Sequence, residues 1–176
     1  MTMETRAAHE VRAEGRKLVG FAAVFDQETR ITDFREVIKR GAFAASLASG
    51  KDILALVDHD SGKVLARTRS GSLRLSENER GLAFELDIPD TSAGRDVLAL
   101  AARGDLGGAS FGFTVEASGE VWSGDKRELR AVTLHEISVV QSFPAYSGTS
   151  VQARSRPATR TTADRRIALL DLEAAR

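Results

Sequence analysis

The chain has 176 residues, 42% of them hydrophobic and 28% charged, a balance typical of one soluble globular domain. Its 25 basic and 25 acidic residues cancel, so no overall charge favours nucleic acid or an anionic membrane as a partner. The absence of cysteine excludes disulfides, a thiol nucleophile and thiolate metal ligands, and no apolar run approaches the roughly 18 residues needed to cross a bilayer.

The sequence contains neither a secretory signal nor a metal-ligand spacing. The N-terminal residues are charged and lack an apolar signal core, so the expected location is cytoplasmic. His9, His59 and His135 are far apart in sequence and form no paired-histidine motif. We therefore expect no metal and no cofactor.

Apolar and alternating runs predict a series of short strands. Residues 1–17 are charged and without a clear period, so a loose N-terminal segment is expected there. Residues 26–33 are polar and predict a loop. The segments 64–68 and 72–75 are expected to pair as a hairpin. The full set of predicted strands is 18–25, 34–38, 53–57, 64–68, 72–75, 81–88, 108–116 and 128–140, the last being one long strand or a bent pair.

Two short helices are expected between these strands. Residues 41–49 are rich in alanine and carry apolar residues four positions apart. Thr91 or Ser92 can cap a second helix over 93–102. Residues 117–127 are polar and predict a turn region. Six or more strands with two helices indicate a mainly β fold of the α+β class, built as a mostly antiparallel barrel or sandwich.

The composition changes from Ala153 onward. Residues 153–176 are rich in arginine and read as a linker followed by a short C-terminal helix over 164–176. A solvated tail without a function of its own is the simpler interpretation of this charge run.

His59 is the first candidate for chemistry. It follows the apolar strand 53–57 and is flanked by Asp58 and Asp60. A histidine at a strand end can leave the core and act as a general base, because imidazole titrates near neutral pH. The alternative is a surface histidine in a turn.

Ser110 is the second candidate, because its neighbours Ala109 and Phe111 are typical core residues and place it on the other side of the strand. Glycines at 108 and 112 leave backbone uncovered around it. Exposed amides beside a serine suit an oxyanion hole, so the amides of Gly108 and Gly112 are candidate donors. The alternative is a small residue on a tightly packed strand whose glycines form bulges.

Glu136 is the third candidate, because it lies in the middle of the apolar strand 128–140. A buried acid is costly unless it is paired, and an imidazole N–H is a suitable partner. Glu136 shares its face with Ser138, whereas His135 shares parity with Ile137 and Val139, which favours a packed role for that histidine. His135 remains a rival for the third position.

These motifs occur in a fixed order: GFAAVFD, EVIKRGAF, DHD, VLARTRSGSLRL, GLAF, PDT followed by GRDV, RGDLGGASFGF, and LHEISVV followed by FPAY. Together they resemble the prohead proteases of tailed bacteriophages. The resemblance runs from about Leu18 to Thr149. Relatives occur in phages, prophages and gene transfer agents, and the resemblance does not distinguish among these sources.

The resemblance implies a serine endopeptidase that acts inside the immature capsid, in the host cytoplasm. It implies the major capsid protein with its scaffolding segment as substrate and partner, and the protease itself as a second substrate in a homo-oligomer. The implied fold is similar to the herpesvirus assembly protease, an antiparallel β-barrel surrounded by short helices, here over residues 18–152.

The resemblance also assigns roles to residues. The histidine of the DHD motif is His59, the serine of the SFGF motif is Ser110, and the acid of the LxE[VI]S motif is Glu136. The herpesvirus relatives have a histidine as third member, which keeps His135 as the alternative. Two other functions are considered: a non-enzymatic capsid-assembly or scaffolding protein on the same fold, and a small β-barrel binding module.

Overall fold

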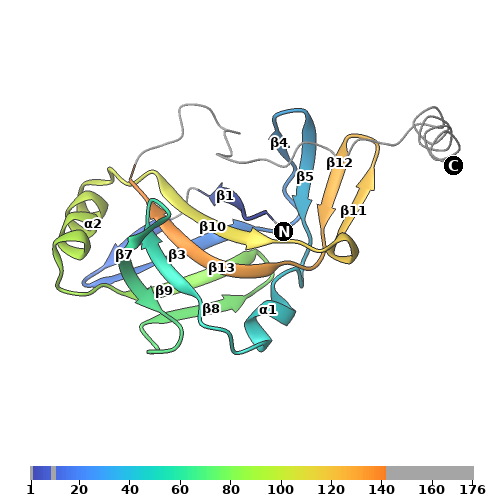
Figure 1. Ribbon diagram of the computed structural model, residues 1–176. Coiled ribbons are helices and arrows are strands. Elements are labelled where there is room, and N and C mark those ends of the chain that lie inside the picture. Colours follow the sequence, from blue (N-terminus) through green and yellow to red (C-terminus); the bar gives the residue numbers. More distant parts are fainter. Residues whose placement is uncertain (1, 9–10, 142–176) are drawn as a thin grey trace, which may run out of the picture.

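The computed structural model describes residues 2–8 and 11–141 of the chain (Figure 1). Two α-helices are present in this part, α1 (Ala44–Ala48) and α2 (Ser92–Arg103), together with the short 3-10 turn η1 (Ala117–Gly119). The strands are β1 (Glu4–Ala8), β2 (Val11–Glu14), β3 (Lys17–Val24), β4 (Thr29–Ile31), β5 (Phe34–Ile38), β6 (Leu54–Val57), β7 (Asp60–Arg67), β8 (Leu73–Glu77), β9 (Gly81–Asp87), β10 (Gly108–Thr114), β11 (Glu120–Ser123), β12 (Lys126–Leu129) and β13 (Thr133–Val140).

The strands of the described residues form three open sheets, with the orders β1-β10-β13-β6-β7, β11-β12-β5-β4 and β2-β3-β9-β8. The expected mainly β, α+β class is confirmed, but the expected antiparallel barrel is wrong. No sheet closes on itself within the described ranges, since each keeps two edge strands. Two pairs, β13 with β6 and β12 with β5, are parallel.

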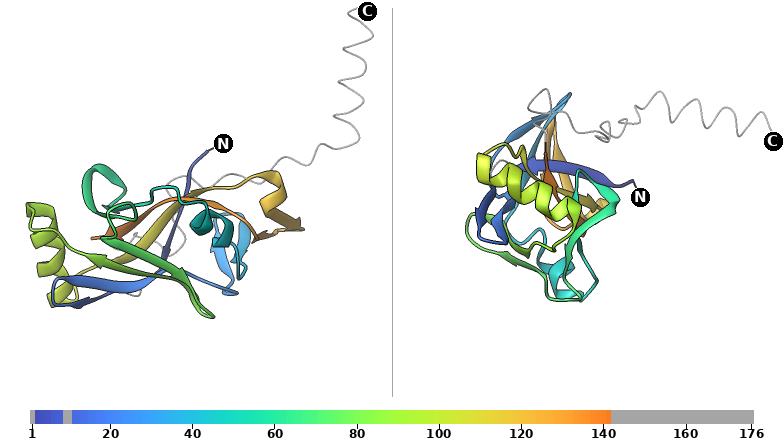
Figure 2. Two further views of the ribbon diagram at one scale, coloured as in Figure 1. Left: turned by 90° about the horizontal axis from the view of Figure 1, so that it is seen from below. Right: turned by 90° about the vertical axis from the view of Figure 1, so that its left-hand side faces the viewer.

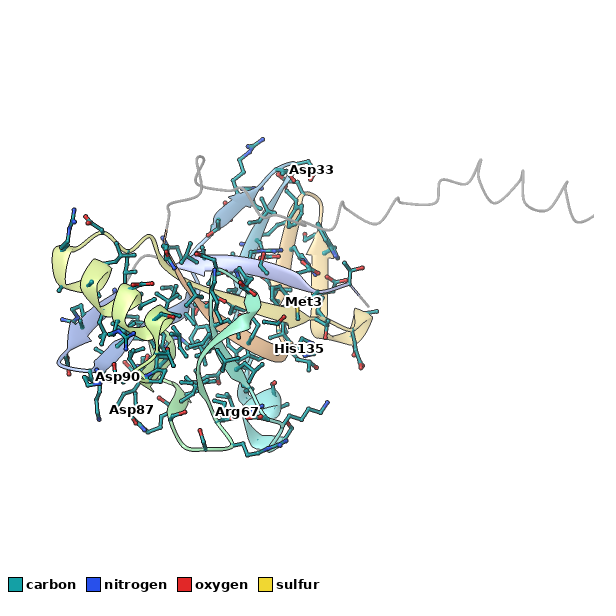
Figure 3. The ribbon with its side chains drawn as sticks, turned by 60° about the vertical axis from the view of Figure 1, so that its left-hand side comes forward. Met3, Asp33, Arg67, Asp87, Asp90 and His135 are labelled. Carbon is teal, nitrogen blue, oxygen red and sulfur yellow. The ribbon has the colours of Figure 1, made fainter. Side chains whose placement is uncertain are left out.

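The sheets are arranged along one long direction of the molecule. Helix α2 lies at one end, and the sheet that contains β11 and β12 lies at the other (Figure 2). Side chains fill the space between the sheets, whereas Asp33 lies at the tip of the β4–β5 hairpin, away from the body (Figure 3).

The hydrophobic core lies largely between the β10–β13 sheet and the β3–β9 sheet. Ala109, Phe111 and Phe113 point into it from β10, as the alternation of that strand predicts. The rings of Phe111 and Phe113 are stacked with centroids 5.1 Å apart, and Phe43 meets Phe111 edge-on at 5.3 Å. Burying each such side chain stabilises the fold by about 1.5–3 kcal/mol. The rigid β10 that results carries Ser110 on its other face.

Helix α2 extends one residue beyond the predicted 93–102 at each end. Thr91 Oγ1 accepts a hydrogen bond from Gly94 N over 3.1 Å, which satisfies one free amide of the first turn. Gly104 ends the helix in the left-handed region with a φ of 75°.

Four local predictions are wrong. The segment 1–17 is not loose, because it contains β1 and β2, which pair with β10 and β3. The segments 64–68 and 72–75 do not form a hairpin, since β7 pairs with β6 while β8 pairs with β9. The polar segment 117–127 contains β11 and the start of β12 rather than a turn region, and the loop expected over 26–33 contains β4.

A buried cluster of charged side chains joins β1 to the β11-β12-β5-β4 sheet. Arg127 makes two hydrogen bonds to Glu4, of 2.6 and 2.9 Å, and Arg6 reaches Glu36 over 2.6 and 2.8 Å. Glu120 adds a further contact to Arg127 at 2.6 Å. Arg127 and Glu4 are fully buried. This cluster fixes β1 against β10, next to Ser110.

The predicted linker and helix over 153–176 lie outside the described residues.

Candidate active site

His59 lies in a two-residue turn between β6 and β7. Val57 and Asp60 pair across this turn, and its central residues, Asp58 and His59, have φ values of 49° and 60°. Two successive positive φ values define a type I′ turn, in which glycine or asparagine is preferred. A histidine at the second central position is therefore held in a strained conformation, which is frequent at functional sites.

The turn is fixed to the end of β13 by three hydrogen bonds. The amide of Asp58 donates to Val139 O over 3.1 Å, and the amide of His59 donates to Ser138 Oγ over 3.0 Å. In return, the amide of Gln141 donates to Asp58 Oδ1 over 2.9 Å. Asp58 thus builds the turn rather than facing the imidazole ring.

The structure brings His59, Ser110 and Glu136 together. The Nδ1 atom of His59 lies 2.6 Å from Glu136 Oε1, and Nε2 lies 2.9 Å from Ser110 Oγ. Glu136 comes from β13 and Ser110 from the neighbouring β10, so the ring extends from the β6–β7 turn over β13 to β10. The side chain of His59 is 32% exposed, whereas Glu136 and Ser110 are buried.

Gly112 makes room for the carboxylate of Glu136. The two residues are opposite each other in the β10–β13 ladder, next to an irregularity in register after Gly112. A Cβ atom at position 112 would lie only 2.3 Å from Glu136 Oε1. The glycine therefore permits the carboxylate to lie flat against β10 while it contacts His59.

Ser110 has a second hydrogen-bond acceptor. Its hydroxyl lies 2.7 Å from the main-chain oxygen of Arg6, the residue whose side chain belongs to the buried charged cluster. Ala7, the residue opposite Ser110 in the β1–β10 ladder, is exposed. Ala7 and the His59 ring therefore mark the accessible side of the site.

In the buried charged cluster beside β1, Glu4 has a lowered pKa. Burial alone would raise the pKa of Glu4, but the hydrogen bond and charge of Arg127, with those of Arg6, outweigh it and lower the pKa below its ordinary value. Glu4 therefore stays ionised and keeps both arginines paired.

His135 is not part of this arrangement. Its Nε2 atom lies 2.9 Å from Thr114 Oγ1, and the residue is half-buried. Successive residues of a strand point to opposite faces, so His135 lies on the other side of β13 from Glu136. Burial lowers the pKa of His135, and the charge of Lys51 lowers it further, while Glu136 opposes both. This favours a neutral, packed imidazole.

The two glycines considered as oxyanion donors lie at the start and near the end of β10. Gly108 has a φ of 130° and pairs with Val140 of β13, whereas Gly112 pairs with Glu136. The assignment of their amides as oxyanion donors stays a prediction. In the described part of the chain, no group of three or more potential ligands is arranged to hold a metal ion. The helices within the same ranges are all too short or too polar to span a membrane.

Sequence reasoning missed two contributors to the site. Ser138 was visible in principle, because it is two positions from Glu136 on the same face of one strand. Arg6 O was not, because a main-chain contact leaves no trace in the sequence, and the charges of β1 favour an exposed segment.

A serine, a histidine and a carboxylate in successive contact form the arrangement that serine proteases of several unrelated folds share. A family model of the caudovirus prohead serine proteases matches residues 2–164, and the chain belongs to this family. The resemblance drawn from the sequence motifs is thereby confirmed, and membership supports a serine protease with a role in capsid maturation. No curated protein and no solved structure shows significant similarity to the chain. The expected likeness to the herpesvirus assembly protease stays an expectation.

Proposed function

We propose that the chain is an endopeptidase that uses Ser110, His59 and Glu136 as nucleophile, general base and orienting acid. The observation that carries this proposal is the unbroken chain of contacts from Ser110 Oγ through the imidazole to Glu136, at 2.9 and 2.6 Å. These distances lie within the range expected for a nucleophile and its base.

The three side chains have distinct roles in the reaction. Ser110 Oγ attacks the scissile carbonyl carbon while His59 Nε2 takes the hydroxyl proton. His59 then gives this proton to the leaving amine, and water repeats the cycle to release the acyl group. Glu136 accepts the hydrogen bond from Nδ1–H, which holds the ring in the required tautomer and stabilises the imidazolium.

The proposed substrate is the scaffolding segment of the major capsid protein, with the protease itself as a second substrate. Family membership supports this choice, because a prohead protease acts while the capsid is immature. The proposed place of action is therefore the interior of the procapsid in the host cell. The exposed Ala7 and the part-exposed His59 ring are solvent-accessible neighbours of the buried Ser110, and we expect an extended peptide to approach on their side.

Two measurements test the proposal. A fluorophosphonate reacts with an activated serine: the Ser110 Oγ–phosphorus bond forms, fluoride leaves, and His59 takes the proton. The purified chain is treated with this probe, and the modified residue is located by peptide mass spectrometry. In parallel, the chain is co-expressed with the major capsid protein of the same genome, and shortening of the capsid protein is followed by intact mass.

Ser110→Ala should abolish both labelling and shortening, and His59→Ala should slow both by at least about 10⁴-fold. Because the two residues act as a unit, the double variant should be no slower than either single variant. Wild-type rates in either folded variant would remove that residue from the mechanism. An unlabelled wild-type chain that still enters particles would favour the scaffolding function instead.

A further inference from the structure

The hydroxyl of Ser138 connects two members of the proposed catalytic unit. It donates a hydrogen bond to Glu136 Oε2 over 2.8 Å and accepts one from the main-chain amide of His59 over 3.0 Å. Ser138 lies on β13 and is 1% exposed. Its proton and one lone pair are therefore both used, and water does not compete for either.

Three hydrogen bonds connect Ser138, Glu136 and His59 in a closed network. The first joins Ser138 Oγ to Glu136 Oε2, the second joins Glu136 Oε1 to the ring of His59, and the third returns from the His59 amide to Ser138 Oγ. Each carboxylate oxygen thus has one partner. Rotation of the carboxylate would break two of the three bonds, so its plane is fixed relative to the imidazole.

The same three hydrogen bonds also hold the β6–β7 turn in its strained conformation. His59 has a φ of 60°, in the left-handed region that residues other than glycine adopt only uncommonly. The amide at this position would be left without a partner if the turn moved away from β13. Ser138 therefore stabilises the conformation that places the imidazole over Ser110.

Burial makes the contact to Glu136 more important. Glu136 is 5% exposed, and within the described residues the hydrogen-bond partners of its side-chain oxygens are His59 and Ser138. A buried carboxylate is costly unless hydrogen bonds replace the water it loses. Ser138 supplies one of these two replacements.

We propose that Ser138 is a positioning residue that sets the orientation of Glu136 and His59 and so determines the reactivity of Ser110. The inference rests on the proposed function, because it assumes that these three residues perform the reaction. Ser138 itself does not touch the substrate. Its loss should lower the rate of the chemical step and leave substrate affinity unchanged.

The test compares Ser138→Ala with a matched control in helix α1 that contacts the same strand. Ser46 is also a buried serine, and its hydroxyl accepts a hydrogen bond from the β13 amide of Leu134 over 2.9 Å, away from the site. Ser46→Ala therefore removes the same kind of contact to the same strand. Fluorophosphonate labelling at several probe concentrations separates the maximal rate, kinact, from the affinity, KI.

Ser138→Ala should reduce kinact by about 10- to 100-fold, as expected when a catalytic group is misplaced by roughly 1 Å, with KI unchanged. Ser46→Ala should keep the wild-type kinact at a comparable loss of thermal stability. Combined with Glu136→Gln, the serine variant should add no further loss, because it acts through the carboxylate. The proton NMR spectrum supplies a second readout: the far-downfield signal of a hydrogen-bonded His59 Nδ1–H should disappear in Ser138→Ala.

If Ser138→Ala does not fold, two variants of equal shape test the role of the Ser138 hydroxyl. Ser138→Thr keeps the hydroxyl and Ser138→Val removes it, so any packing cost is common to both. The threonine variant should react at least about tenfold faster than the valine variant. Equal rates, or a wild-type kinact in Ser138→Ala, would overturn the positioning role. Failure of the wild-type chain to label would overturn the proposed function instead, so the two failures are distinguishable.

Discussion

Ser110 Oγ donates a hydrogen bond to the main-chain oxygen of Arg6 over 2.7 Å, so the proposed nucleophile has two acceptors, this oxygen and His59 Nε2 at 2.9 Å. The hydroxyl proton must point to Nε2 before attack. The position of β1 therefore influences which rotamer of the hydroxyl is favoured. Because Arg6 anchors β1 to Glu36 of β5, and Glu4 anchors it to Arg127 of β12, the buried charged cluster is connected to the reactivity of the site.

The first prediction is that Arg6→Met loosens β1. The change leaves Glu36 with one partner fewer in a buried site, and breaking a buried pair costs about 3–5 kcal/mol. Labelling of Ser110 in the folded protein should become faster, since Arg6 O, which competes with His59 Nε2 for the hydroxyl proton, is no longer held in place. Urea unfolding and the labelling rate measure the two effects.

Arg35→Met is the control for this prediction. Arg35 lies on β5 beside the cluster, but its ion pairs with Asp125 and Glu28 are exposed and screened by solvent. The free energy of unfolding and the labelling rate should change little. An Arg6→Met protein as stable and reactive as the Arg35→Met protein would disprove the anchoring role of the cluster.

The second prediction concerns acid. The pKa of Glu4 is lowered from its ordinary value of 4.5, so the unfolded chain binds the proton more readily than the folded one. The stability this gives is complete above pH 4.5 and is lost as the pH falls through the folded-state pKa. The difference in the free energy of unfolding between wild type and Glu4→Gln should therefore shrink below pH 4.5. A difference that is constant from pH 3 to 7 would contradict the prediction.

The same cluster explains why part of the fold was not predictable from the sequence. Strands β3, β5, β9 and β10 show apolar or alternating patterns, and the sequence places them within two residues of their observed bounds. Strands β1, β11 and β12 carry Glu4, Arg6, Glu120 and Arg127, which are typical of a solvent-exposed segment. Their burial depends on partners that are up to 123 residues away, which no local pattern records.

The sequence predicted which residues form the candidate site, but not how they are arranged in space. The motifs select His59, Ser110 and Glu136, but these residues are separated by 51 and 77 positions. Their contact depends on the register of β6 with β13 and of β13 with β10, one of which is parallel. An error of one residue in either register would place Glu136 or Ser110 on the opposite face.

The third prediction separates Glu136 from His135. Glu136→Gln should lower kcat by at least about 10²-fold, because an amide can orient the ring but cannot stabilise its charge. His135→Phe should leave kcat nearly unchanged, because the His135 ring contacts Thr114 and not the site. Rates of capsid-protein shortening provide the measurement. The reverse result would assign the third role to His135.

His135→Phe should also change how the free energy of unfolding depends on pH. Because the pKa of His135 is lowered from 6.5, its contribution to stability is complete above pH 6.5 and falls as the pH drops toward the folded-state pKa. His135→Phe should remove this part of the pH dependence. The slope of the free energy of unfolding against pH, between pH 5 and 7, measures it directly.

The last prediction is that Gly112→Ala damages activity more than stability, whereas Gly81→Ala does the opposite. At position 112 a Cβ atom would meet the end of the Glu136 side chain at 2.3 Å, and that carboxylate can rotate away while β10 stays in place. The rotation separates Glu136 from His59 Nδ1, so kcat should fall by roughly 10²-fold.

At position 81 the Cβ atom would meet the main-chain oxygen of Ala23 at 2.0 Å, where only a backbone shift relieves the clash. Such overpacking costs about 1–3 kcal/mol, but β9 lies outside the site, so the folded fraction should label at the wild-type rate. Thermal unfolding and fluorophosphonate labelling of both variants distinguish the two effects. If Gly112→Ala labels as fast as wild type, the glycine does not make room for the orienting acid, and the close contact between Glu136 and His59 is not needed for reaction.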